Sequence, residues 1–232
     1  MKAFCIALPG LRSSLEQARK CIETAASFDL EASLFVGTHR FEAVEVASES
    51  GLPRKGFDYV HWHRERPLRD AQLGCFLSHF RLWRECVALD QPIIVFEHDA
   101  VVRAPVPFID PIACEVVNLQ ESIWNDPSWP FHSAVATLRD SVPTTGANCC
   151  EGGLLPGAYV CLPGTCAYWI SPAASRRLID QALNEGPLPA DIFINKSVVN
   201  IKDCIPFPAI GEHIISTVAP GADWEGFDIN NQ

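Results

Sequence analysis

Short apolar segments alternate with segments of helical periodicity through the first part of the chain. Residues 2–8 and 32–36 have the composition of buried strands. Helical spacing follows each of them, first from Ser13, where Glu16 completes a capping box, and then over about residues 41–50. Strands that alternate with helices form parallel sheets in which the helices connect neighbouring strands. The sequence therefore predicts an α/β fold with a mostly parallel sheet flanked by helices.

A third helix and a third strand follow. Apolar positions 73, 76, 77, 80, 83 and 87 predict an amphipathic helix over residues 73–89. Residues 93–96, Ile-Ile-Val-Phe, form a continuous apolar run that is typical of a central parallel strand. This run leads directly into Glu97, His98 and Asp99. Because ligands of open α/β sheets bind beyond the carboxyl ends of the strands, these three residues mark the candidate functional site.

The second part of the chain is less regular. Residues 120–157 are rich in turn-forming residues and predict a long irregular insert, which usually supplies a lid or a binding loop. The remaining elements are expected to be strands at 116–119, 159–162 and 166–170, a helix from Ser171-Pro172 to residue 183, and a helix over 192–200 capped by Asp191.

Charge and composition exclude several functions. The chain of 232 residues has 18 Lys and Arg against 28 Asp and Glu, a formal net charge of −10. This balance argues against a nucleic-acid binder that neutralises phosphates over a broad surface. No apolar run reaches about 18 residues, so no transmembrane helix is expected. The ten cysteines show neither a CxxC pair nor zinc-finger spacing, which favours a cytoplasmic protein with reduced thiols.

One basic segment contrasts with this negative charge. Its positive side chains are Arg54, Lys55, Arg64, Arg66 and Arg69. The segment is either a solvated loop or a binding surface for an anionic ligand, such as the pyrophosphate of a sugar nucleotide.

Glu97, His98 and Asp99 are the residues best suited to chemistry. Two carboxylates and an imidazole can together hold a divalent metal ion. Ionised carboxylates beside an apolar strand are costly unless they are paired or bound to a metal. The alternative interpretation is a pair of strand-end carboxylates that cap a helix or pair with an arginine.

A second candidate set consists mainly of histidines. His61 and His63 form an HxH pattern, and with His79 and Asp99 they resemble the ligand set of a metal-dependent hydrolase. A serine hydrolase has no support, because no GxSxG elbow occurs. Neither a P-loop nor a GxGxxG motif is present.

Four blocks of the sequence, taken in order, resemble glycosyltransferase family 25, the lipooligosaccharide and collagen galactosyltransferase family. Residues 5–12 resemble its opening strand, 73–83 look like its GC-x-LSH helix start, 93–100 are similar to its apolar strand ending in Glu-Asp-Asp, and 164–171 are close to its G-T-x-A-Y-x-I-S lead-in. Pro189-Ala190-Asp191 matches the Pro-x-Asp that follows downstream. The chain departs from the family pattern at its second acidic position, where it has a histidine.

This resemblance implies a GT-A fold, related to the Rossmann fold, and a single domain over residues 1–232. Residues 1–103 would form the nucleotide-sugar half and residues 104–232 the acceptor half. The implied activity is the inverting transfer of a hexose, galactose or glucose, from a UDP-linked sugar to a hydroxyl acceptor such as a saccharide. Trp124 and Trp129 could stack on the acceptor, and the net charge argues against a nucleic-acid acceptor.

The resemblance also implies roles for individual residues. Glu97, His98 and Asp99 would hold Mn²⁺ or Mg²⁺ with His213 completing the shell, and Asp191 would be the base that deprotonates the acceptor. The residues expected to contact the donor are Arg12, Ser78, His79, Thr165 and Tyr168. Two alternatives stay open: the metal-dependent hydrolase, and a non-catalytic relative that binds a nucleotide sugar or a glycan.

Overall fold

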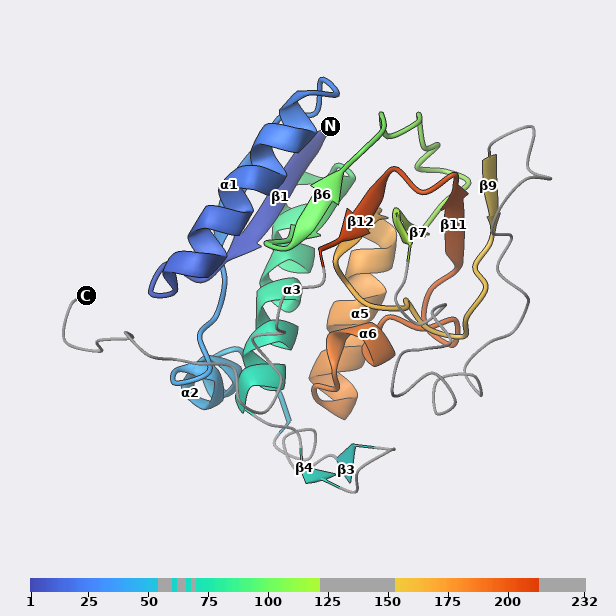
Figure 1. Ribbon diagram of the computed structural model, residues 1–232. Helices are drawn as coiled ribbons and strands as arrows, with labels where there is room; N and C mark the ends of the chain where they lie inside the picture. Colours follow the sequence, from blue (N-terminus) through green and yellow to red (C-terminus); the bar gives the residue numbers. More distant parts are fainter. Residues whose placement is uncertain (54–59, 62–65, 68–69, 122–152, 213–232) are drawn as a thin grey trace.

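The computed structural model describes residues 1–53, 60–61, 66–67, 70–121 and 153–212, and Figure 1 shows how their helices and strands are arranged. Several residues that the sequence singled out lie outside this part of the chain. They are the charged side chains of the segment 54–69, His63, Trp124, Trp129 and His213. Of His61, only the backbone is described.

A seven-stranded sheet forms the centre of the fold. In spatial order its strands are β2 (Ala32–Val36), β1 (Lys2–Ala7), β5 (Ile93–Glu97), β10 (Ala167–Ile170), β7 (Val116–Asn118), β11 (Ile201–Ile205) and β9 (Gly153–Pro156). β2, β1 and β5 are parallel, as the sequence predicts. β7 and β11 are also parallel, but β10 runs antiparallel to both of its neighbours and β9 runs antiparallel to β11. The α/β fold class is confirmed, with a mixed sheet.

Two smaller sheets accompany the main one. β6 (Ala100–Val102), β12 (Ala209–Gly211) and β8 (Gln120–Glu121) form a three-stranded sheet with β12 in the middle. β3 (Val60–His61) and β4 (Arg66–Pro67) form an antiparallel pair. The three-stranded sheet begins directly after β5, so the turn that contains Asp99 joins the two larger sheets.

Helices cover both faces of the main sheet. They are α1 (Arg12–Ala26), α2 (Ala43–Glu49), α3 (Asp70–Leu89), α5 (Pro172–Glu185) and α6 (Ala190–Phe193). One hydrophobic core contains residues of α2, α3, α5 and α6, and a second contains residues of α1 and of the three-stranded sheet. Figure 1 shows α3 and α5 side by side, and α1 beside β6.

The central strand β5 belongs to both cores. Ile93 and Val95 pack in the core of α3 and α5, whereas Ile94 and Phe96 pack in the core of α1. All four side chains are fully buried. Burying an aliphatic or aromatic side chain of this size contributes about 1.5–3 kcal/mol to folding. Burial on both faces is the physical reason for the continuous apolar run in the sequence.

The start of the first helix differs from the prediction. α1 begins at Arg12, and its N-cap residue Leu11 makes no side-chain cap, so the capping box is wrong. Glu16 instead accepts a hydrogen bond from Arg12 Nε at 2.7 Å, one turn earlier, because a charged donor lies within its reach. The neighbouring Ser14 uses its Oγ to accept from the Leu8 N–H at 3.0 Å, which fixes the connection from β1.

Predictions for the last part of the chain are correct at its start and wrong further on. Ser171 caps α5 by accepting from the Ala174 N–H at 3.2 Å, as expected. The expected strand at 159–162 is not a continuous strand; its residues form isolated bridges, one of them from Cys161 to Asn195. The expected helix over 192–200 is a single turn, because the Asn195 side chain accepts from the Ser197 N–H and this local turn competes with helix continuation.

Candidate active site

An open cavity of about 530 Å³ lies at the carboxyl ends of β1 and β5. Its walls are residues at these strand ends, the loop after β2 and one face of α3. Glu97 and His98 line the cavity, whereas Asp99 lies one residue further, in the turn toward β6. The cavity is thus where the sequence places the functional site.

The position of α3 against the loop after β2 shapes this cavity. Ser78 Oγ accepts from the Thr38 N–H and donates to the Gly74 carbonyl, both at 2.8 Å. Gly74 allows the approach, because a Cβ at this position would lie 2.7 Å from the Thr38 carbonyl oxygen. Arg81 Nη1 donates to the Val36 carbonyl at 3.2 Å and to Thr38 Oγ1 at 3.3 Å.

Gly74→Ala is therefore expected to destabilise the protein by about 1–3 kcal/mol, because the added methyl group meets backbone that cannot move aside. A drop in melting temperature of roughly 2–12 °C would follow for a chain of this length. The control is Gly153→Ala, since no atom of the described residues lies within 4 Å of a Cβ built at Gly153. If Gly74→Ala did not melt below Gly153→Ala in a thermal denaturation series, the close approach would be contradicted. Without a clash, alanine at position 74 would stabilise α3, because alanine favours the helix more than glycine does.

Glu97 is the most closely held carboxylate of the site. Its Oε1 accepts a hydrogen bond from Thr165 Oγ1 and lies 3.1 Å from His79 Nε2. Its side chain is 25% exposed, and His79 is fully buried. Burial favours the protonated acid, but the hydrogen bonds from His79 and Thr165 outweigh burial and hold the pKa of Glu97 below its ordinary value. Glu97 thus places a fixed negative charge at the cavity wall.

The negative charge of Glu97 acts on two further carboxyl groups. Burial, together with the charge of Glu97, raises the pKa of Asp99 to about 7 and the pKa of Asp191 to about 6. Asp99 Oδ1 is buried and has no hydrogen-bond partner among the described residues. Carboxylates that repel one another in a partly buried site favour the binding of a cation.

His98 and Cys75 provide other potential ligand atoms. Burial lowers the pKa of His98, so its imidazole is neutral at physiological pH and can act as a nitrogen ligand. The ligand atoms of Cys75, His79 and Glu97 lie within 4.8 Å of one another, so these three residues could also hold a metal ion. However, burial and the neighbouring carboxylates raise the pKa of the Cys75 thiol well above its ordinary value, which disfavours the thiolate that a metal requires.

Glu97, His98 and Asp99, here called the acidic turn, offer the ligand types of a divalent cation. The structure does not bring their ligand atoms into one group within 4.8 Å, as it does for Cys75, His79 and Glu97. Glu97 and Asp99 supply carboxylate oxygens and His98 a neutral nitrogen, a combination that suits Mn²⁺ and, with oxygen alone, Mg²⁺. The unpartnered Asp99 Oδ1 is the observation that supports this fit.

Asp191 lies on α6, which packs against α3. Phe193 packs its ring against Phe76 and Trp83 of α3, at centroid distances of 5.0 and 5.8 Å. Asp191 lies in the first turn of α6, and the N-cap residue is Pro189, so the expectation that Asp191 caps this helix is wrong. Asp191 is not among the residues that line the cavity, but burial and the charge of Glu97 raise the pKa of its carboxyl group.

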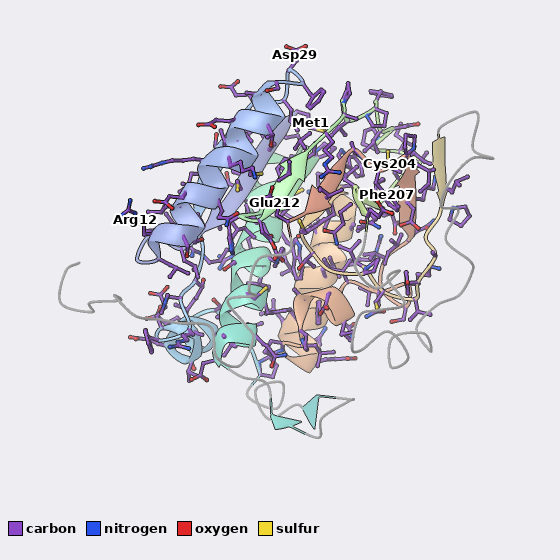
Figure 2. All side chains as sticks on the ribbon, viewed as in Figure 1. Met1, Arg12, Asp29, Cys204, Phe207 and Glu212 are labelled. Atoms are coloured by element: carbon purple, nitrogen blue, oxygen red, sulfur yellow. The ribbon has the colours of Figure 1, made fainter. Side chains whose placement is uncertain are left out.

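The residues expected to contact the donor have different surroundings. Ser78 and His79 line the cavity, whereas Thr165 and Tyr168 are buried behind Glu97 and His79. Arg12 has a 92% exposed side chain that pairs with Glu16. Figure 2 shows it at one end of α1, projecting away from the protein.

Arg40 is a cavity residue that the sequence analysis missed. It is the one Arg or Lys among the described residues that line the cavity, and its guanidinium lies 4.8 Å from the ring centroid of Phe41. The available signal was its position in the loop after the second strand, near the carboxyl edge of the sheet. The hydrolase ligand set gains no geometric support, because His63 and the side chain of His61 lie outside the described residues.

An α/β fold with an open cavity and an acidic turn at the carboxyl end of a central strand is typical of enzymes that act on phosphorylated ligands. The chain belongs to glycosyltransferase family 25, since the model of Glycosyltransferase family 25 (LPS biosynthesis protein) matches residues 14–194. This membership confirms the predicted resemblance and implies glycosyltransferase activity.

The matched segment contains three of the four blocks, the acidic turn and Asp191, and it excludes the block at 5–12. No curated protein matches the chain. Among the residues that the structure describes, no helix is long and apolar enough to cross a membrane.

Proposed function

We propose that this protein transfers a hexose, galactose or glucose, from a UDP sugar to a hydroxyl group of a saccharide acceptor. Family membership supports the transferase class. The observation that carries the proposal is the cavity at the carboxyl ends of β1 and β5. Glu97, His98 and Arg40 line it, and the charge of Glu97 helps to raise the pKa of Asp99 and of Asp191. In the proposed single domain, residues 1–103 bind the nucleotide sugar and residues 104–232 bind the acceptor.

The leaving diphosphate is the part of the donor that needs stabilisation. A Mn²⁺ or Mg²⁺ ion bound by Glu97, His98 and Asp99, with His213 as a further ligand, would neutralise the charge that develops on it. Arg40, in the loop after β2 that also lines the cavity, would add charge-assisted hydrogen bonds to phosphate oxygens.

Other donor contacts are assigned by their place around this cavity. Ser78 and His79 line it and are proposed to face the donor. Thr165 and Tyr168 support this wall from behind, and Arg12 is proposed to reach the nucleotide from the start of α1.

Asp191 is proposed to take the proton of the acceptor hydroxyl. Its pKa of about 6 leaves it mainly ionised at neutral pH, yet more basic than an ordinary aspartate. The acceptor oxygen forms a bond to the anomeric carbon, the bond from that carbon to the diphosphate breaks, and the proton passes to Asp191. A single displacement of this kind inverts the anomeric configuration, and NMR analysis of the product that showed retention would contradict it.

A thermal-shift panel tests the donor site. UDP and UDP sugars are expected to raise the melting temperature by roughly 5–11 °C at about 100 times Kd, since binding at that ratio contributes about 2.7 kcal/mol. Mn²⁺ should increase the shift, and GDP, CDP and ADP should give less. Arg40→Ala should weaken the UDP effect, whereas Arg176→Ala, which removes an exposed arginine paired with Asp90, should leave it unchanged.

The panel also separates the alternatives. No shift with any nucleotide, combined with bound zinc or iron in the purified protein, would favour the metal-dependent hydrolase. Nucleotide-sugar binding without turnover at any metal concentration would favour a non-catalytic relative. The observation that supports the non-catalytic alternative is His98, which stands in place of the family's aspartate.

A further inference from the structure

Four side chains form a hydrogen-bonded series from the core to the cavity. Trp83 Nε1 lies 3.0 Å from the Tyr168 hydroxyl oxygen, and this hydroxyl lies 3.0 Å from His79 Nδ1. His79 Nε2 lies 3.1 Å from Glu97 Oε1. Trp83, Tyr168 and His79 are fully buried, and Glu97 lines the cavity. The series therefore connects the packing between α3 and β10 with the acidic turn.

The chemistry of these groups fixes the direction of each hydrogen bond. An indole N–H can only donate, so the Tyr168 oxygen accepts from Trp83. The hydroxyl proton of Tyr168 has one acceptor at hydrogen-bond distance among the described residues, the Nδ1 atom of His79. Nδ1 must then be unprotonated, and the ring proton is carried by Nε2, which donates to Glu97 Oε1.

The opposite tautomer leaves two groups unsatisfied. With the proton on Nδ1, the Tyr168 oxygen would receive two donors, and its own proton would have no acceptor in the described part of the core. The lone pair of Nε2 would also face the carboxylate oxygen of Glu97. Buried polar groups without partners are costly, so the packing of Trp83 and Tyr168 selects the Nε2–H tautomer.

We propose that Tyr168 and Trp83 are positioning residues that act through His79 on the carboxylate of Glu97. Oε1 of Glu97 receives the protons of both His79 and Thr165, and this leaves Oε2 as the oxygen available to a ligand in the cavity. The carboxylate thus presents one oxygen in a fixed orientation. The role in cation and donor binding rests on the proposed function, whereas the tautomer of His79 does not.

Metal binding separates a positioning role from a purely structural one. Tyr168→Phe keeps the ring and removes the hydroxyl, so the Mn²⁺ affinity measured by titration calorimetry should fall roughly 10–100-fold, the usual effect of losing a supporting hydrogen bond. Trp83→Phe should also lower the Mn²⁺ affinity. Trp169→Phe is the matched control, because Trp169 is equally buried but packs in the other core, with its Nε1 3.1 Å from Met1 Sδ.

The kinetics and melting temperatures of the same three variants complete this test. A structural role would lower the melting temperature of all three and leave the Mn²⁺ affinity of each folded variant unchanged, which would overturn the proposal. A selective loss of Mn²⁺ affinity and kcat in Tyr168→Phe and Trp83→Phe supports it.

The tautomer is measured independently of activity by long-range ¹H–¹⁵N NMR of the wild-type protein, with His79→Gln used to assign the signals. The expected spectrum has a protonated Nε2 and an unprotonated Nδ1, and in Tyr168→Phe the Nδ1 signal should move toward that of a nitrogen without a hydrogen bond. A proton on Nδ1 in the wild type overturns the proposal even if the variants do not fold. A wild type that binds neither nucleotide nor Mn²⁺ contradicts the proposed function, while the spectrum still decides the tautomer.

Discussion

Asp191→Asn is expected to lower kcat by roughly 10²–10⁴-fold, the loss typical of removing a general base, with nearly unchanged affinity for the donor. The amide keeps the shape of the side chain and its place in the first turn of α6, but it cannot accept the proton of the acceptor hydroxyl. Steady-state kinetics with a donor titration measure both quantities. The rate of donor hydrolysis by water, measured in the same assay, should fall in parallel.

Asp180→Asn provides the control for this variant. Asp180 is an exposed carboxylate on α5, so its replacement changes the net charge by the same amount without touching the site. We expect wild-type kinetics for Asp180→Asn. If Asp191→Asn instead lost donor affinity, Asp191 would be a structural residue of the donor site.

Asp99→Asn is expected to abolish donor binding or turnover and at the same time to stabilise the protein at alkaline pH. The pKa of Asp99 is raised from 3.8 to about 7, chiefly by burial. Between these two values the folded protein holds a proton that the unfolded chain releases, so stability falls as the pH rises through this window. Asparagine has no charge to bury, so the stability of the variant does not fall with pH for this reason.

The measurement is a series of melting temperatures across pH, combined with Mn²⁺-dependent activity. Asp99→Asn should melt above the wild type at pH values higher than about 7 and approach it in mild acid. The control is Asp110→Asn, an exposed residue whose Oδ1 accepts from the Ile112 N–H, a bond that asparagine also makes. Full Mn²⁺-dependent activity in Asp99→Asn would remove the acidic turn from the proposed metal site.

Much of the first part of the fold was predictable because local pattern and burial agree there. The apolar run at 93–96 became the central strand β5, since both of its faces are covered and no polar residue is tolerated. The helix expected over 73–89 is α3, extended by one turn to Asp70. The same agreement placed Glu97 and Asp99 at the end of that strand, beside the cavity.

The same patterns did not predict the direction of β10 or the length of α6. The segment Ala167–Ile170 is buried on both faces, and such a segment has the same composition whether it runs parallel or antiparallel to β5. The one-turn length of α6 depends on the Asn195 side chain, whose turn with Ser197 is as local as the helix it replaces.

The supporting residues of the site could not be found in the sequence because their partners are distant in the chain. Trp83 and Tyr168 have the composition of ordinary core positions, and only the packing of α3 against β10 brings them into one hydrogen-bonded series with His79. Arg40 likewise could not be identified from the sequence, because only the folded structure shows that it lines the same cavity as α3.

The hydrogen bond from the Glu212 N–H to the Asp99 carbonyl, at 2.9 Å, has a consequence for biosynthesis. Asp99 leaves the ribosome long before β12, the strand that pairs with β6 and ends beside the acidic turn. A nascent chain can therefore form β1, β2 and β5 early, yet it lacks the backbone partner of Asp99 until translation has passed residue 212. Prematurely terminated products would carry the acidic residues without the strand that fixes their turn, and a series of purified C-terminal truncations across residues 205–212 would show whether Mn²⁺ affinity depends on β12.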